Sequence, residues 1–227
     1  MKQIFKITII ALTLSFVVSS SVKAQTEKRY IFNLASAIEK EFNDYLTAGF
    51  ELEGEICPDP STKTVMFKPV VEFSPIQYLS FEAEYRFKAE NEEGESAWQR
   101  RFGIAAKGKY AFNHLKLSTR LKYCLYSDDY DEDTKEQYFR TRFQAQYKIK
   151  PIKLTPYVSY EWFYNIPRGL VDRDRWTFGV EKKLNKRNTL GFEYQCEERF
   201  NRTNAKRTKL KNDIAENTFS ITYKFEL

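Results

Sequence analysis

The chain has 227 residues and a formal net charge of +6, and aromatic and charged residues make up 16% and 30% of it. The aromatic content supplies enough apolar surface to bury, which excludes an intrinsically disordered chain. A helical membrane protein is also excluded, because the sequence lacks several runs of about 20 apolar residues.

The first 24 residues have the features of a secretory signal peptide. Lys2 and Lys6 precede an apolar run over residues 7–18, and a small-x-small ending follows at Val22-Lys23-Ala24. A structural N-terminal helix is the alternative, but no polar residues line one face of this segment. The sequence therefore predicts a cleaved signal peptide over 1–24 and one domain over 25–227.

Cleavage would remove three of the 37 basic residues and none of the 31 acidic ones, so the net charge falls from +6 to +3. An excess of that size is too small for a nucleic-acid-binding surface. We therefore expect no nucleic-acid partner.

From residue 29 onward, apolar and polar residues alternate almost everywhere. This period of two is typical of β-strands, and no amphipathic helix interrupts it. We predict about eleven strands, near residues 29–42, 45–56, 64–73, 78–90, 97–112, 115–127, 137–149, 152–164, 174–184, 188–200 and 215–227.

Short and long connections alternate between these strands. Tight turns are predicted at 43–44, 74–76, 113–114, 150–151 and 185–187, and longer polar loops near 57–63, 90–96, 127–136, 165–173 and 201–214. Such a rhythm places tight turns at one end of a sheet and loops at the other, as in an up-and-down barrel of a bacterial outer membrane. The predicted fold is all-β, an antiparallel transmembrane β-barrel of about 10–12 strands.

The strand number has two solutions, since single-chain bacterial barrels have even numbers of strands. In the first, the N-terminal segment lies inside the lumen and ten strands close the barrel. In the second, residues 25–30 contain part of a twelfth strand.

Alternation alone also fits a soluble barrel of the lipocalin type, whose apolar face lines a cavity. Two features favour a membrane barrel instead. The strands are long enough for the 9–11 residues that cross a bilayer. All three tryptophans, Trp98, Trp162 and Trp176, fall on the apolar face beside a long loop, as expected for an aromatic girdle.

The end of the chain, Tyr223-Lys224-Phe225-Glu226-Leu227, resembles the C-terminal signal of outer-membrane barrels, although their commonest last residue is Phe. Two further stretches resemble the outer-membrane barrel family called domain of unknown function 2490. One is the hairpin from Ile38-Glu39-Lys40-Glu41-Phe42 to Phe50-Glu51-Leu52-Glu53, and the other runs from Arg140-Thr141-Arg142 to Pro156-Tyr157 and Glu161.

These resemblances imply a porin-like barrel in the outer membrane of a Gram-negative bacterium and assign no activity. The implied assembly signal is Tyr223, Phe225 and Leu227, read by the barrel-assembly machinery. The expected partners are outer-membrane lipid and lipopolysaccharide, whose phosphates the basic loop over 202–211 is placed to meet.

If the apolar face is outside, the charged face lines the lumen. Acidic residues dominate the early strands and basic residues the middle ones, and the candidate lumen residues are Arg101, Arg120, Arg140, Arg142, Glu161 and Arg175. Folding about a turn at 150–151 predicts that Arg140 lies directly opposite Glu161. Such a pair contributes about 0.2–1 kcal/mol to a sheet.

Two interpretations of this lumen remain. In the leading one, opposite charges pair and fill the interior, because narrow barrels are just wide enough for their side chains. The protein is then a non-enzymatic barrel with a structural or surface-interacting role. The alternative is a narrow channel for small polar or anionic solutes.

An outer-membrane hydrolase is the third hypothesis. Known hydrolases of this architecture use a catalytic histidine, whereas the single histidine here, His114, falls in a tight turn away from the loops. We assign no catalytic residue, metal site or cofactor. The acidic loop over 128–133 lacks the glycine and distal glutamate of an EF-hand, and the three cysteines show no metal-binding spacing.

Overall fold

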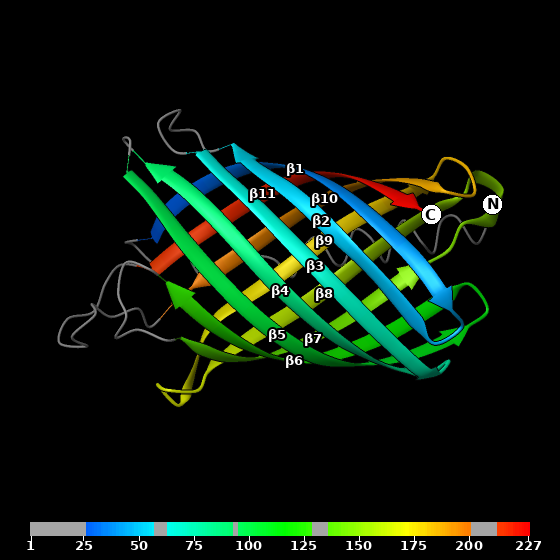
Figure 1. Cartoon of the computed structure of the whole chain (residues 1–227), viewed down its shortest axis with the longest axis horizontal. Helices are drawn as coiled ribbons and strands as arrows, with labels where there is room; N and C mark the ends of the chain where they lie inside the picture. The colour runs from blue at the N-terminus through cyan, green and yellow to red at the C-terminus, as the bar shows by residue number, and fades with distance from the viewer. Residues whose placement is uncertain (1–25, 57–62, 93–94, 129–135, 201–212) are drawn as a thin grey trace, which may run out of the picture.

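The computed structural model describes residues 26–56, 63–92, 95–128, 136–200 and 213–227. The predicted signal peptide therefore lies outside the described residues. Eleven strands form one closed barrel (Figure 1), which confirms the predicted all-β barrel. The strands are β1 Thr26–Asn43, β2 Leu46–Ile56, β3 Lys63–Ile76, β4 Leu79–Glu92, β5 Glu95–Phe112, β6 Leu115–Asp128, β7 Gln137–Tyr147, β8 Leu154–Asn165, β9 Leu170–Lys183, β10 Asn188–Arg199 and β11 Asp213–Glu226.

Each strand pairs antiparallel with the next one in sequence, and the barrel closes through a parallel pair, β1 with β11. The parallel register runs from Thr26↔Asp213 to Glu39↔Glu226. With an odd number of strands, the first and the last run in the same direction, so the closing pair must be parallel. Both expected even-numbered solutions were wrong: β1 is part of the barrel wall, and the described residues contain no twelfth strand.

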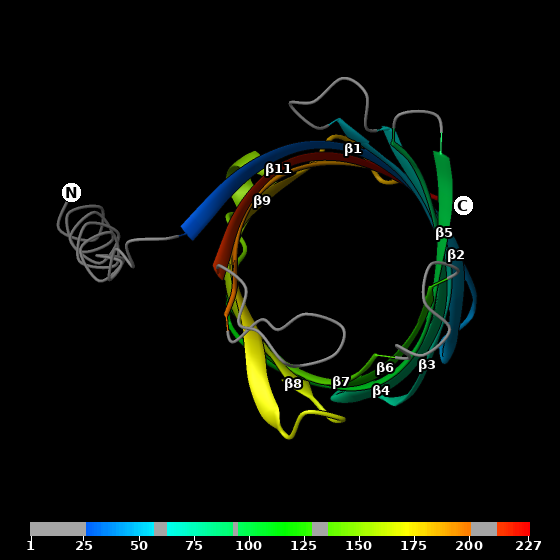
Figure 2. The ribbon, with the colours of Figure 1, turned by 90° about the vertical axis from the view of Figure 1, so that its left-hand side faces the viewer.

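The connections divide the barrel into two ends, which Figure 1 shows at left and right. At the loop end, β2, β4, β6, β8 and β10 lead into the next strand, and β1 begins there. At the turn end, short turns join the other pairs, and a single 3₁₀ turn, Lys150–Ile152, precedes β8. Figure 2 looks at the barrel from the loop end. Among the described residues, no helix is long and apolar enough to cross a membrane.

Two of the predicted long loops are shorter than expected. β4 and β5 pair as far as Glu92↔Glu95, and β8 and β9 are joined by residues 166–169, where Gly169 has φ +66°. The predicted turn at 74–76 belongs to β3. Charged residues at the ends of these strands belong to the barrel rim, so their polarity gave a false loop signal.

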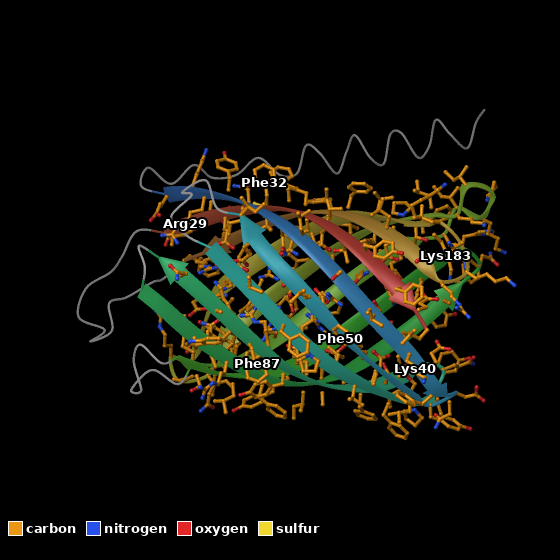
Figure 3. All side chains as sticks on the ribbon, turned by 45° about the horizontal axis from the view of Figure 1, so that its top comes forward. Arg29, Phe32, Lys40, Phe50, Phe87 and Lys183 are labelled. Atoms are coloured by element: carbon orange, nitrogen blue, oxygen red, sulfur yellow. The ribbon has the colours of Figure 1, made fainter. Side chains whose placement is uncertain are left out.

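Alternation places apolar side chains outside and polar ones inside. Phe32 and Leu34 are 56% and 54% exposed on the outer face, while the alternate residues Asn33 and Ala35 are buried toward the lumen. Figure 3 shows the same for Phe50 and Phe87, whose rings lie on the outside of the wall. Together these outward side chains give the barrel an apolar outer surface.

Candidate functional site: a divided lumen

The lumen contains two cavities separated by charged side chains. A cavity of about 1120 Å³, here the loop-end cavity, is lined by strand residues near the loop end. A second cavity of about 740 Å³, the turn-end cavity, lies at the opposite end. The side chains between them form what we call the central layer, and none of them lines either cavity: Glu72, Glu82, Glu84, Lys107, Arg120, Lys122, Arg142 and Glu161.

Glu161 is the centre of one buried ion-pair group. Arg140 donates from Nε and Nη2 to its two carboxylate oxygens at 3.2 and 2.9 Å, and Arg120 donates from Nη2 to Oε1 at 2.8 Å. The Glu161 side chain is only 3% exposed, and that of Arg140 is 6% exposed. Since Arg120 lies on β6 and Glu161 on β8, the pair spans the intervening strand β7.

The predicted register at this point was wrong. Arg142 lies directly opposite Glu161, and Arg140 lies opposite Phe163. The turn before β8 contains the 3₁₀ segment and Lys153, whose φ is 52°. Its centre lies later in the sequence than residues 150–151, so the strand pairing shifts by two residues. Arg140 still reaches Glu161 because an arginine side chain is long enough to contact a diagonal neighbour.

Arg142 and Arg175 do not join this ion pair. Arg142 forms no ion pair among the described residues, and Arg175 donates to Glu197 instead, with Nε at 2.9 Å. Arg101, the remaining candidate from the sequence, pairs with Glu84 at 2.7 Å.

A second buried group joins the acidic strands β3 and β4 to the basic strands β5 and β6. Lys107 contacts both Glu72 and Glu82, and Lys122 contacts both Glu82 and Glu84. The Lys122 side chain is 2% exposed. The acidic and basic segments seen in the sequence therefore meet as neighbours in the wall.

A glycine makes room for this arrangement. Lys122 must cross β5 to reach Glu84, and the β5 residue at the crossing is Gly103. A Cβ at Gly103 would lie 2.8 Å from Lys122 Cε and 3.0 Å from Glu84 Cγ. A glycine inside a strand often marks such a close approach. Gly103 was therefore the sequence feature that could have indicated the contact between Lys122 and Glu84.

The loop-end cavity is bordered by a third charged group. Glu197 accepts from Arg175 and from Arg199 at 2.7 Å, and Arg173 lies 3.5 Å away. A bulge between β8 and β9 at Phe163/Tyr164 also places Asp172 beside this cavity. There Asp172 accepts from Asn165 at 2.9 Å and Arg168 at 3.1 Å. Bulges commonly redirect side chains in this way.

The residues considered for catalysis or metal binding are dispersed. His114 lies in the β5–β6 turn and lines the turn-end cavity. Its ring centroid is 6.0 Å from that of Tyr147. Cys124 and Cys196 are both free thiols. Cys57, the 129–133 part of the acidic loop and the basic loop 202–211 lie outside the described residues. Within the described ranges, no group of three His, Cys, Asp or Glu side chains is placed to hold a metal ion.

The three tryptophans lie on the outer face. Trp162 and Trp176 both contact Tyr160, with ring centroids 6.0 and 4.7 Å apart, and Trp98 on β5 is 51% exposed. Trp98 and Trp162 lie near the loop end of their strands, whereas Trp176 lies in the middle of β9, away from the rim where the sequence placed it. Their role at a membrane boundary stays a prediction.

The C-terminal strand ends at the turn end of the barrel (Figure 1). Tyr223 is exposed on the outer face, and Phe225 pairs in register with Ile38 of β1. Leu227 donates its backbone N–H to the Glu39 carbonyl at 2.8 Å. The assembly-signal role of Tyr223, Phe225 and Leu227 also stays a prediction.

Several solved structures are similar in fold. They include a bacterial polysaccharide outer membrane secretin (13% identity, 81% of this chain and 63% of that chain, TM-score 0.48). An anion-selective porin from Comamonas acidovorans matches at 14% identity, over 77% of this chain and 55% of that chain, with TM-score 0.37. The outer-membrane expressed OmpT of Vibrio cholerae matches at 14% identity, over 78% of this chain and 62% of that chain, with TM-score 0.40.

The chain thus spans less than two thirds of the length of each of these structures. No curated protein matches the chain. The family model described as protein of unknown function (DUF2490) matches residues 23–209, and the chain therefore belongs to the DUF2490 family.

Proposed function

We propose that this protein is a non-enzymatic outer-membrane β-barrel whose lumen is closed by its own side chains. The observation that carries the proposal is the central layer, in which buried and half-buried carboxylates and bases from β3 to β8 contact one another between the two cavities. Its role is structural or surface-interacting, with the loop end directed outward.

The outer surface supports the membrane location. Large apolar side chains such as Phe32, Phe50 and Phe143 are exposed around the wall. A soluble protein rarely exposes a continuous apolar surface of this extent. A closed barrel satisfies its backbone hydrogen bonds internally, which is the condition for crossing a bilayer with strands. Lipid and lipopolysaccharide are the proposed surroundings.

The charge pairing supports a closed lumen. In an eight-stranded barrel the interior is just wide enough for side chains to fill it. Eleven strands enclose more space, and here long lysine, arginine and glutamate side chains occupy the middle of it. Because each carboxylate of the central layer contacts at least one base, these side chains are held in place.

A narrow channel is the second candidate. The cavities extend inward from both ends, so the central layer is the part that separates them. Basic residues outnumber acidic ones in the described lining of both cavities, so a channel would favour anions.

Hydrolysis is not part of the proposal. The described lining of the loop-end cavity contains neither histidine nor cysteine. His114 lies at the other end of the barrel and contacts a tyrosine ring.

Planar-bilayer recordings test the closed lumen. We expect purified protein, inserted at high copy number, to give no stable unit current steps. Insertion is verified separately by protease protection of lipid vesicles that contain the same purified protein. Stable unit currents from the unmodified protein would contradict the closed lumen and would favour the channel function.

Fractionation tests the location. In a Gram-negative host, we expect the protein in the outer-membrane fraction, and its gel mobility should shift on boiling because a folded barrel resists detergent at room temperature. A periplasmic soluble protein of similar size serves as the fractionation control. Recovery of the folded protein with that control would contradict the membrane assignment.

A further inference from the structure

We propose that the loop-end cavity is a binding site for a small soluble organic anion that carries a carboxylate or phosphate group, held chiefly by Arg86 and Arg101. This inference goes beyond the closed barrel, since a barrel that does not conduct can still bind a solute at its mouth. Four observations lead to it.

Two arginines lie side by side on the lumen face without a carboxylate between them. Arg86 of β4 and Arg101 of β5 are directly opposite in the register. Like charges in that position destabilise a sheet. Arg101 pairs with Glu84, whereas Arg86 forms no ion pair among the described residues and donates only to the neutral Gln99 amide oxygen, at 3.1 Å.

The hydrogen-bonding capacity of these groups is largely unused. A guanidinium has five N–H donors. The Nε atoms of Arg86, Arg101 and Arg173 are buried and have no hydrogen-bond partner among the described residues. A buried donor without a partner is costly. One buried acceptor beside the same cavity, Asp172 Oδ1, also has no partner among the described residues. Unpartnered arginine donors still outnumber it, so the cavity has donors to spare for an added acceptor.

A second pair of opposite arginines, elsewhere in the wall, is neutralised by carboxylates of the protein itself. Arg173 and Arg199 are also directly opposite one another. There, Glu197 contacts both arginines and Glu216 contacts Arg199 at 3.1 Å. The pair formed by Arg86 and Arg101 lacks an equivalent shared acid, so an anion from solution can take that place.

An aromatic cluster underneath orients the guanidiniums. The Cζ of Arg140, Arg173 and Arg175 lies 4.3, 5.0 and 5.3 Å from the Phe163 ring centroid, and that of Arg101 lies 5.7 Å from the Tyr126 centroid. Phe163 is 1% exposed, so its ring chiefly packs against the arginines. A guanidinium presents the planar donor geometry that suits carboxylate and phosphate.

The size and charge of the cavity set the class of ligand. Ten basic and six acidic residues line its described part, a basic excess that concentrates anions. A volume of about 1120 Å³ admits a sugar phosphate or a tricarboxylate with its water. The described lining lies on the lumen face of the strands, away from the outer apolar surface, so a soluble anion fits better than a phosphate held in the membrane.

Calorimetric titration of the refolded, lipopolysaccharide-free barrel in a neutral detergent tests the site. The probes are glucose 6-phosphate and citrate, with glucose as the uncharged match of the first. We expect saturable binding of at least one anion and no binding of glucose. Absence of saturable binding for both anions would overturn the proposal.

Four variants assign the site. Arg86→Gln and Arg101→Gln should each weaken binding at least tenfold, and Arg86→Lys should give an intermediate loss because it keeps the charge and loses the planar donors. Lys40→Gln removes a positive charge at the turn end and should leave binding unchanged. Equal affinity in all four variants would overturn the assignment.

A structural role for Arg86 would give a different result. Because Arg86 repels Arg101, Arg86→Gln should leave the boiling-dependent gel shift intact and should not lower resistance to urea. A destabilised Arg86→Gln barrel would show that the arginine is structural.

Lipid provides the last comparison, through micelles that contain diphosphorylated lipid A. If glucose 6-phosphate and citrate fail to bind while lipid A binds in an Arg86-dependent way, the soluble-anion proposal is wrong. Its failure would leave the conductance result, and hence the closed barrel, unaffected.

Discussion

The Glu161→Gln variant is expected to lower the free energy of unfolding by about 3–5 kcal/mol, because it leaves two buried guanidiniums without their carboxylate. Both Arg140 and Arg120 donate to this side chain, and Glu161 is almost fully buried. The glutamine has nearly the same volume, so the change isolates the charge. Urea-dependent unfolding from phospholipid vesicles, followed by tryptophan fluorescence, measures it.

Glu226→Gln is the matched control. Its carboxylate lies 3.4 Å from Lys183 Nζ at the turn end, and both side chains are more than a third exposed. An exposed pair contributes about 0–1 kcal/mol, so this variant should unfold almost as the unmodified protein does. Equal effects of the two substitutions would show that the Glu161 group is hydrated and does not hold the central layer together.

Replacing four residues of the central layer by alanine should convert the closed barrel into a conducting one. The quadruple variant removes two acids and two bases, so the net charge stays the same. Its substitutions are Glu84→Ala, Arg120→Ala, Lys122→Ala and Glu161→Ala. These are four of the eight side chains of the central layer, and we expect their removal to connect the two cavities. Planar-bilayer recordings should show stable unit steps that the unmodified protein lacks.

The double variant Lys183→Ala with Glu226→Ala is the control, because it removes one balanced charge pair away from the central layer. It should remain without steps. The boiling-dependent gel shift verifies that each variant is folded. A folded four-alanine barrel that stays silent would mean that other side chains close the lumen.

Alternation in the sequence was sufficient to predict the strands and which residues share a face, whereas the strand length and the tryptophan positions indicated that the apolar face is the outer one. The segment predicted over 137–149, for example, is β7 from Gln137 to Tyr147, with Arg140 inside and Phe143 outside. A period of two fixes which side chains share a face, so the candidate lumen residues could be selected without coordinates. The strand ends at 90–92 and 172–174 were not predicted from alternation. Strand ends that project beyond the apolar belt need not alternate between apolar and polar residues.

Contacts between strands depend on quantities that a sequence does not contain. A shift in the centre of the turn after β7 moved the partner of Glu161 from Arg140 to Arg142. Contacts that cross a whole strand, such as Arg120 with Glu161, require the curvature of the closed barrel. The pattern itself indicated eleven segments, and the barrel has eleven strands. Only the expectation of an even number was wrong, because it came from a rule for other barrels.

The parallel pairing of β1 with β11 imposes an order on assembly. Every other strand finds a partner that immediately precedes it in the chain, so the sheet can grow hairpin by hairpin. The free edge of β1 must wait for the last strand, Asp213–Glu226, which is separated from it by nearly the whole chain. Contacts so distant in sequence form slowly, and an unpaired strand edge is a template for aggregation. The final strand therefore covers the edge of β1 when it pairs, and this pairing removes the last free edge of the sheet.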